Sequence, residues 1–167
     1  APMYWSGVRD QEQLTKHKAI GKNGDMAKYL CPRSKQTPAI ASAVIADIVK
    51  RYNLDGVKID FMDLGPAQCF NENHEHVKDD FGEGMDRIFG ALHDEITKVN
   101  PNALIEFRMN YTNLNNRQYG NCFRADDAPY DPDQIRRNMA MIKRWSGSIP
   151  PHADYAYWPP DETDANK

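Results

Sequence analysis

The sequence predicts an α/β fold in which strands and helices alternate and the strands run parallel. Short apolar runs, each followed by polar residues, alternate with segments of helical periodicity. Two segments begin with a capping residue and a proline, at Thr37-Pro38 and Asp131-Pro132, which is typical of helix starts. Because strands joined by helices run parallel, the alternation indicates either an open doubly wound sheet or part of a (β/α)8 barrel.

Apolar runs of strand length recur along the chain, and the expected strands are Met3–Gly7, Val57–Phe61, Leu104–Phe107, Cys122–Ala125 and His152–Tyr155. The stretch from Arg9 to Leu30 is polar, contains Gly21 and Gly24, and shows no period. We therefore expect a long loop there.

Helices are expected between these strands. The first has Thr37 as its N-cap and Pro38 as its first helical residue. The second ends at Asn100-Pro101. Its apolar side chains recur at helical spacing, and these are Met85, Ile88, Phe89, Leu92, Ile96 and Val99. The third follows a cap at Asp131 and continues to about Trp145.

Amino-acid composition indicates how many domains the chain forms and which kinds of partner it is unsuited to bind. The 167 residues, of which 40% are hydrophobic and 27% charged, suit one domain with a sizeable core. A formal net charge of −3 provides no basic surface for nucleic acid or an anionic membrane, and we expect neither partner. No run approaches the roughly 18 apolar residues of a membrane helix. The sequence does not indicate the cellular compartment of the protein.

The cysteines and histidines do not follow a familiar ligand spacing. Cys31, Cys69 and Cys122 are widely separated and form no CxxC pair, so we expect buried or loop thiols and neither a disulfide framework nor a zinc site. His74-Glu75-His76 offers two histidines in a polar loop without further spaced ligands. The sequence therefore predicts no metal and no cofactor.

Lys58 and Asp60 lie two residues apart at the end of an apolar run, so strand alternation directs both to one face. Opposite charges in a core strand are costly unless they pair with each other or with a ligand. The C-terminal end of a parallel strand is where α/β folds place their chemistry. The two residues are therefore either a structural ion pair or part of a catalytic site.

Polar residues also follow the other strands, and the full set is Lys58, Asp60, Asp63, Glu106, Arg108, Asp126, Asp127, His152 and Asp154. In either α/β architecture these positions converge on one rim. The sequence contains no glycine-rich phosphate loop after a strand and no serine-nucleophile motif. Carboxylates at the ends of different strands indicate glycoside cleavage, which needs one as nucleophile or base and another as acid.

Two segments resemble catalytic strands of the α-galactosidase (melibiase) clan, in particular glycoside hydrolase family 36. Leu54-Asp55-Gly56-Val57-Lys58-Ile59-Asp60-Phe61 is similar to the nucleophile strand, in which a Lys-x-Asp ends the fourth barrel strand. Phe123-Arg124-Ala125-Asp126-Asp127, with Arg136 downstream, is similar to the acid/base segment. Similarities at Tyr4-Trp5-Ser6-Gly7 and around His152-Ala153-Asp154 extend the resemblance over nearly the whole chain.

The resemblance implies that Asp60 is the nucleophile and Asp126 the general acid/base, with Asp127 as the fallback. The substrate-binding residues expected at the rim are Lys58, Asp63, Glu106, Arg108, Arg124, Asp127, His152, Asp154 and Trp5. After the fifth-strand carboxylate the family has a cysteine, two glycines and an arginine, whereas Glu106 is followed by Phe107 and Arg108. Specificity for galactose therefore stays open.

The implied fold is a partial (β/α)8 TIM barrel made of strands three to seven, because a complete barrel needs about 250 residues. Residues 1–167 would then be a single catalytic-domain fragment of a larger enzyme, completed by missing parts of the parent chain or by self-association. The implied activity is that of a retaining hydrolase of α-linked sugars, with a carbohydrate as partner. A transglycosidase of the same fold and a non-catalytic carbohydrate-binding fragment are the alternatives.

Overall fold

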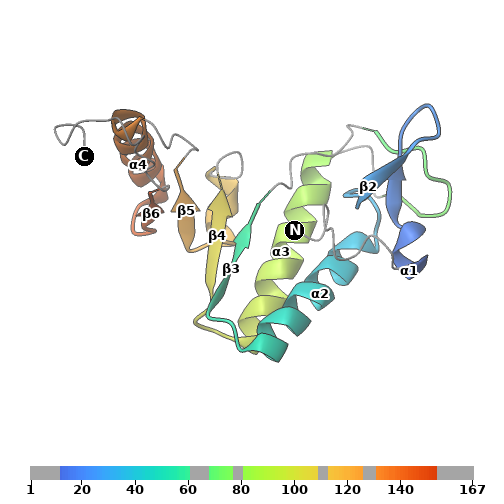
Figure 1. Ribbon diagram of the computed structural model, residues 1–167, viewed down its shortest axis with the longest axis horizontal. Coiled ribbons are helices and arrows are strands. Elements are labelled where there is room, and N and C mark those ends of the chain that lie inside the picture. Colours follow the sequence, from blue (N-terminus) through green and yellow to red (C-terminus); the bar gives the residue numbers. More distant parts are fainter. Residues whose placement is uncertain (1–11, 61–67, 77–80, 109–112, 126–130, 154–167) are drawn as a thin grey trace, which may run out of the picture. The chain divides into compact units, whose positions relative to one another are not determined.

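The computed structural model describes residues 12–60, 68–76, 81–108, 113–125 and 131–153. Figure 1 shows the mixture of helices and strands, coloured in chain order. The chain divides between Ile105 and Glu106 into two compact units. Each unit is described by itself below.

The first unit begins with a hairpin where the sequence predicts a loop. Helix α1 (Glu12–Thr15) leads into strands β1 (Lys18–Ile20) and β2 (Met26–Leu30), which pair in antiparallel orientation. Gly24 in the connecting turn has a φ of +83°, a conformation that favours glycine. The loop prediction is therefore wrong at residues 12–15, 18–20 and 26–30, because strands of 3 and 5 residues are too short for their period to show.

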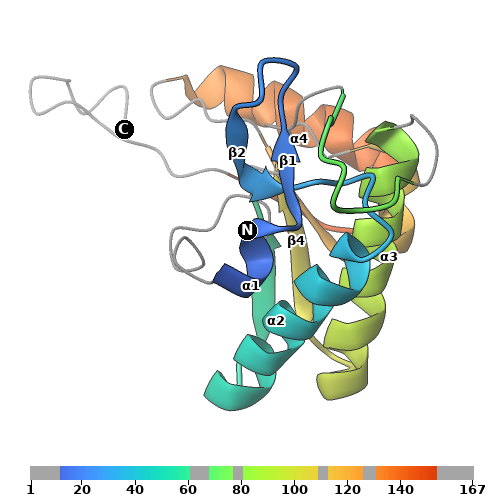
Figure 2. The ribbon, with the colours of Figure 1, turned by 90° about the vertical axis from the view of Figure 1, so that its right-hand side faces the viewer.

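Two long helices, α2 (Thr37–Tyr52) and α3 (Phe81–Val99), lie side by side in the first unit (Figures 1 and 2). The apolar side chains predicted for α3 are buried, apart from the exposed Val99. The buried face of α2 carries mostly small side chains, including Ala41, Ser42 and Ala46. Small side chains at a contact allow two helices to approach closely.

The start of α2 differs by one residue from the prediction. Gln36 is the N-cap, makes no side-chain cap hydrogen bond, and is followed by Thr37 as the first helical residue. Thr37 is completely buried, so packing has overridden its capping preference. The helix ends at Asn53, whose φ of 48° lies in the left-handed region that closes many helices.

Strand β3 (Gly56–Ile59) lies beside the first residues of β4 (Leu104–Arg108). The backbone N–H of Leu104 donates to the carbonyl of Asp55 at 2.8 Å. A Cβ on residue 56 would lie 2.4 Å from the Leu104 carbonyl oxygen, so only glycine permits this approach.

The second unit holds the remainder of β4, the 3₁₀ helix η3 (Asn115–Gln118), β5 (Cys122–Arg124), α4 (Pro132–Ser146) and β6 (Pro151–His152). β5 pairs in parallel with both β4 and β6, and α4 is the crossover between β5 and β6. As predicted, Asp131 caps α4, because its carboxylate accepts a hydrogen bond from the Gln134 N–H at 2.8 Å.

The prediction of an α/β fold with a parallel sheet is confirmed, and the strand order is β3-β4-β5-β6. Three predicted strands occur with ends within a residue or two of those expected. Strand β6 spans Pro151–His152, and residues 154–155 of the fifth predicted strand lie outside the described residues. The strand predicted at Met3–Gly7 lies outside the described residues. Within the described ranges, no helix combines the length and apolar character needed to cross a bilayer.

Candidate functional site

Lys58 and Asp60 lie at the C-terminal end of β3 and form the expected ion pair. The Lys58 Nζ is 3.0 Å from the Asp60 Oδ2, and the two side chains are 40% and 24% exposed. Ile59 between them is buried, so alternation puts the charged pair on the opposite side of the strand. An ion pair this exposed stabilises a fold by at most about 1 kcal/mol. The pair therefore contributes little to stability and leaves its carboxylate accessible.

In the second unit, the sheet has one polar face. The register places Glu106 beside Cys122 and Arg108 beside Arg124. Side chains alternate along a strand, and residues in register share a face. These polar residues therefore lie on one face of the β4–β5 pair. Arg124 is also in register with His152 of β6, which extends the polar face across the third strand.

The opposite face of this sheet is apolar and is covered by α4. The rings of Phe107 and Phe123 are stacked with centroids 6.1 Å apart, and Phe123 lies 5.0 Å from Trp145 of α4. Both phenylalanines are fully buried. The polar face is consequently the one that α4 does not cover.

Glu106 is the acidic centre of the polar face. It is 7% exposed, and its Oε2 lies 2.6 Å from the Nδ1 of His152. The Cys122 thiol lies 3.8 Å from the same oxygen. Burial, with a smaller effect from Glu106, raises the pKa of Cys122 to about 11. At neutral pH Cys122 is therefore a thiol rather than a nucleophilic thiolate.

Arg124 supplies buried positive charge to this face. It is 7% exposed and lies in register between Arg108 on one side and His152 on the other. Guanidinium groups only donate, in a planar fork that suits carboxylate and hydroxyl oxygens. Among the described residues, the face therefore combines the Glu106 carboxylate as acceptor with the guanidinium donors of Arg108 and Arg124.

The predicted residues are thus divided between the two units and the undescribed segments. Lys58 and Asp60 lie in the first unit, and Glu106, Arg108, Arg124 and His152 share the polar face of the second. The acid/base candidate Asp126 lies outside the described residues, as do Asp63, Asp127, Asp154 and Trp5.

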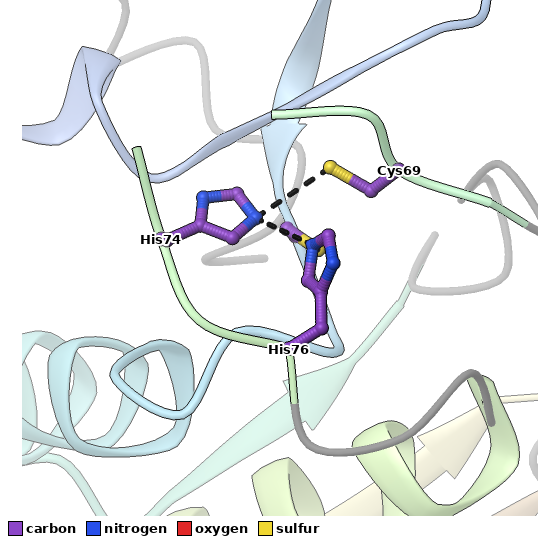
Figure 3. A group of neighbouring side chains, drawn as sticks. Cys69, His74 and His76 are labelled. Atoms are coloured by element: carbon purple, nitrogen blue, oxygen red, sulfur yellow. Dashed lines mark hydrogen bonds between the residues drawn. The ribbon is translucent and has the colours of Figure 1, made fainter. Parts of the chain in front are cut away.

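A cluster of potential metal ligands occurs in the first unit, where the sequence predicts no metal site. Cys31, Cys69, His74 and His76 meet in the first unit, with one ligating atom from each within 4.8 Å of all the others. Figure 3 shows the side chains of Cys69, His74 and His76 converging. Both cysteines are buried, as predicted, but they lie against histidines rather than alone.

Burial keeps several of these groups in their neutral forms. It raises the pKa of the Cys31 thiol to about 11, and the neighbouring Cys69 adds to the effect. It lowers the pKa of His74 and of the nearby His17. A low-polarity site of this kind disfavours any uncompensated charge.

Sequence spacing hid this group because Cys31 and His76 are 45 residues apart. The available signal was the close spacing of Cys69, His74 and His76 within one polar loop. Only the hairpin that the sequence did not reveal brings Cys31 to that loop.

Comparison of the sequence with protein-family models and with curated proteins gave no match.

Proposed function

We propose that this chain carries catalytic strands of a retaining glycoside hydrolase that acts on α-linked sugars and is most similar to an α-galactosidase of family 36. The observation that carries the proposal is the accessible Lys58–Asp60 pair at the end of β3, in the Lys-x-Asp pattern of that family. Chemistry at the C-terminal end of a parallel strand is the rule in α/β folds. The exposure of the pair argues against a purely structural ion pair.

The polar face of the second unit supports a carbohydrate as the substrate. Sugar hydroxyls both donate and accept hydrogen bonds, and Glu106, Arg124 and His152 offer an acceptor and donors on one sheet face. In the proposed (β/α)8 barrel this face would line the interior, and α4 would belong to the outer ring. The barrel, and the place of this chain as one fragment of it, are part of the same proposal.

The proposed reaction is a double displacement. Asp60 attacks the anomeric carbon while Asp126 protonates the departing glycosidic oxygen, which forms a covalent glycosyl-enzyme. Asp126 then removes a proton from water, which attacks the same carbon and releases Asp60. Lys58, which pairs with Asp60 at 3.0 Å, donates to a sugar hydroxyl. Asp63, Asp127, Asp154 and Trp5 complete the proposed substrate site.

Turnover of an aryl α-galactoside tests the proposal, with the intact parent protein measured beside residues 1–167. Asp60→Asn should reduce the turnover of the intact protein by at least about a thousandfold, because a neutral amide cannot form the covalent intermediate. Asp47→Asn is the matched control, since Asp47 is an exposed carboxylate on α2. Near-normal turnover by Asp60→Asn would exclude Asp60 as the nucleophile.

Asp126→Ala separates the acid/base role from the nucleophile. Its rate loss should be smaller for leaving groups that need no protonation, and azide should restore the second step. Product analysis distinguishes hydrolysis from sugar transfer to another acceptor. If the intact protein binds the sugar but never turns it over, the hydrolase proposal fails and the carbohydrate-binding alternative holds.

A further inference from the structure

The loop that carries Cys69, His74 and His76 is joined by backbone hydrogen bonds to the hairpin and to the segment just before α2. The Phe70 N–H donates to the Ile20 carbonyl at 2.9 Å, and the Lys35 N–H donates to the Glu75 carbonyl at 3.1 Å. Cys31 lies directly after β2, and its own N–H donates to the His17 carbonyl at 2.9 Å. Backbone bonds therefore link the segments that carry the four side chains.

Two of the distances between the ligating atoms lie near the S–N edge of a metal-centred tetrahedron, and the N–N distance is a few tenths of an ångström shorter than its edge. The Cys31 Sγ and His76 Nε2 are 3.5 Å apart, and so are the Cys69 Sγ and His74 Nε2. The Nε2 atoms of His74 and His76 are 2.9 Å apart. With Zn–S near 2.3 Å and Zn–N near 2.0–2.1 Å, a tetrahedron would separate S from N by roughly 3.6 Å and N from N by roughly 3.3 Å.

The surroundings orient these atoms toward one another. The His74 Nδ1 lies 3.4 Å from the Lys16 carbonyl, so that nitrogen carries the proton and Nε2 keeps its lone pair. The backbone N–H groups of Ile20 and Asn71 donate to the Cys69 sulfur at 3.4 and 3.5 Å. Such donors stabilise the negative charge of a thiolate, and second-layer bonds of both kinds accompany metal sites in proteins.

Asn71 holds the loop of residues 68–76 in the conformation that brings Cys69 and His74 together. Its Nδ2 donates to the carbonyls of Lys16 and Lys18 at 3.2 and 2.6 Å, and its Oδ1 accepts from the Asn73 N–H at 2.9 Å. The side chain therefore joins the loop to residues 16–18, a segment that also supplies the partner of His74. Asn71 is itself buried.

We propose that Cys31, Cys69, His74 and His76 bind one Zn²⁺ ion in a closed structural site. Four protein ligands fill the tetrahedron and leave no position for substrate, which is the arrangement of structural rather than catalytic zinc. Two thiolates and two neutral imidazoles make the loaded site neutral, which suits its burial. The ion would tie the loop of residues 68–76 to the end of the hairpin. This inference is independent of the proposed glycosidase activity.

Binding changes the proton arrangement in a defined way. The Arg33 guanidinium donates to the His76 Nδ1 at 3.2 Å, so His76 carries its proton on Nε2 and can donate it to His74. Zn²⁺ takes the lone pairs of both Nε2 atoms and both sulfurs. Two thiol protons are released to solvent, the His76 proton moves to Nδ1, and the Arg33 donor must turn away.

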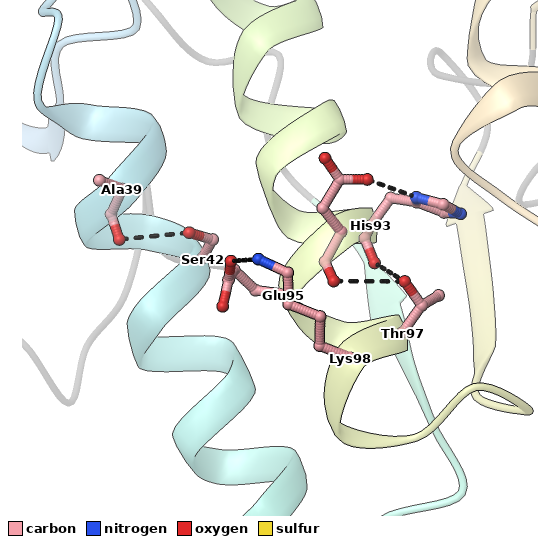
Figure 4. A network of polar contacts seen from close by, with 7 residues as sticks. Ala39, Ser42, His93, Glu95, Thr97 and Lys98 are labelled. Carbon is pink, nitrogen blue, oxygen red and sulfur yellow. Dashed lines mark hydrogen bonds and ion pairs between the residues drawn. The ribbon is translucent and has the colours of Figure 1, made fainter.

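The first experiment measures zinc in the untagged full chain after dialysis. One zinc ion per chain is expected for wild type, and Cys69→Ser or His74→Gln should reduce the content to near zero. Cys122→Ser and His93→Gln are matched controls that should retain the ion. Cys122 is also a buried thiol, and Figure 4 shows His93 on α3, where its Nδ1 lies 3.1 Å from the Asp94 carboxylate.

A second measurement uses wild type alone, so its result cannot be affected by variants that fail to fold. Replacement of zinc by Co²⁺ in wild type should produce the intense ligand-field bands of tetrahedral cobalt together with sulfur-to-cobalt charge transfer. A chelator should abolish these bands and lower the melting temperature of wild type.

Several results would overturn the assignment. One is the absence of zinc from wild type after incubation with Zn²⁺ under reducing conditions. Another is an equal zinc content in wild type and the ligand variants, which would indicate adventitious ions only. A third is an octahedral spectrum for the cobalt-substituted protein. A Cys31–Cys69 disulfide that survives excess thiol reductant would overturn it as well, because both sulfurs would then be unable to bind the ion.

Discussion

Lys58 and Asp60 form an ion pair along one side of β3, with Nζ 3.0 Å from Oδ2, and neither side chain is buried. A pair with this exposure gains little net energy, because water screens the attraction and both side chains lose rotational freedom. Its geometry instead holds a carboxylate and an ammonium side by side at the end of a parallel strand. Substitution of Lys58 should therefore affect stability and activity to different extents.

Lys58→Met should change the free energy of unfolding by less than about 1 kcal/mol. The same substitution should lower kcat/KM by roughly 10- to 100-fold in the intact protein, since a hydrogen bond from a charged donor contributes about 1.5–3 kcal/mol. Urea unfolding and steady-state kinetics on one preparation measure both quantities. A large loss of stability with unchanged kcat/KM would identify a structural ion pair and contradict the proposed role.

Cys122 should make stability depend on pH in the alkaline range. Burial and Glu106 raise the pKa of this thiol from an ordinary 9.0 to about 11. The folded protein then holds the proton more tightly than the unfolded chain. The contribution of Cys122 is fully present below about pH 9 and is lost as the pH rises through about 11.

Cys122→Ala should therefore flatten the decline of unfolding free energy across this window. Urea titrations of wild type and variant, compared at each pH, isolate the effect because the other titrating groups are common to both proteins. The neutral-pH difference between them measures the cost of the deleted sulfur. Parallel pH profiles would show that Cys122 ionises normally in the folded state.

The two proline-marked helices should respond differently when their first polar residue is replaced. Asp131→Ala should cost about 0.5–2 kcal/mol, because its carboxylate accepts the Gln134 N–H and caps α4. Thr37→Val should be neutral or stabilising, since the buried Thr37 hydroxyl finds no hydrogen-bond partner among the described residues. Chemical denaturation of both variants is the test, and equal losses would mean that Thr37 also acts as a cap.

Gly84→Ala should destabilise the protein although alanine favours helices. A Cβ on residue 84 of α3 would lie 2.6 Å from the carbonyl oxygen of Pro32, a backbone atom that cannot move aside easily. The clash, of order 1–3 kcal/mol, should exceed a helix-propensity gain of about 1 kcal/mol.

Gly21→Ala is the matched control for this prediction, because its nearest atom would be the Asp25 carbonyl oxygen at an ordinary 3.7 Å. Melting temperatures of the two variants provide the comparison. Because Pro32 follows Cys31, Gly84→Ala should also weaken zinc binding. A gain in melting temperature for Gly84→Ala would show that the helix can shift without cost.

Local signals predicted the elements that short stretches of chain determine. The cap at Asp131 depends on a residue three positions away, and the buried face of α3 depends on a 3.6-residue period repeated over 19 residues. The hairpin of β1 and β2 gave too short a pattern to detect, and its pairing depends on contacts with residues far along the chain, such as the bond between Phe70 and Ile20.

By itself the sequence determined the α/β class, the end of α3, the limits of α4, and the placement of Lys58 and Asp60 on one side of a strand. These follow from backbone geometry acting over a few residues. Only the tertiary structure decided that Thr37 would be buried rather than cap a helix, and that Cys31 would meet Cys69, His74 and His76. Such contacts join residues as many as 45 positions apart, and their energies depend on packing and burial that no local pattern records.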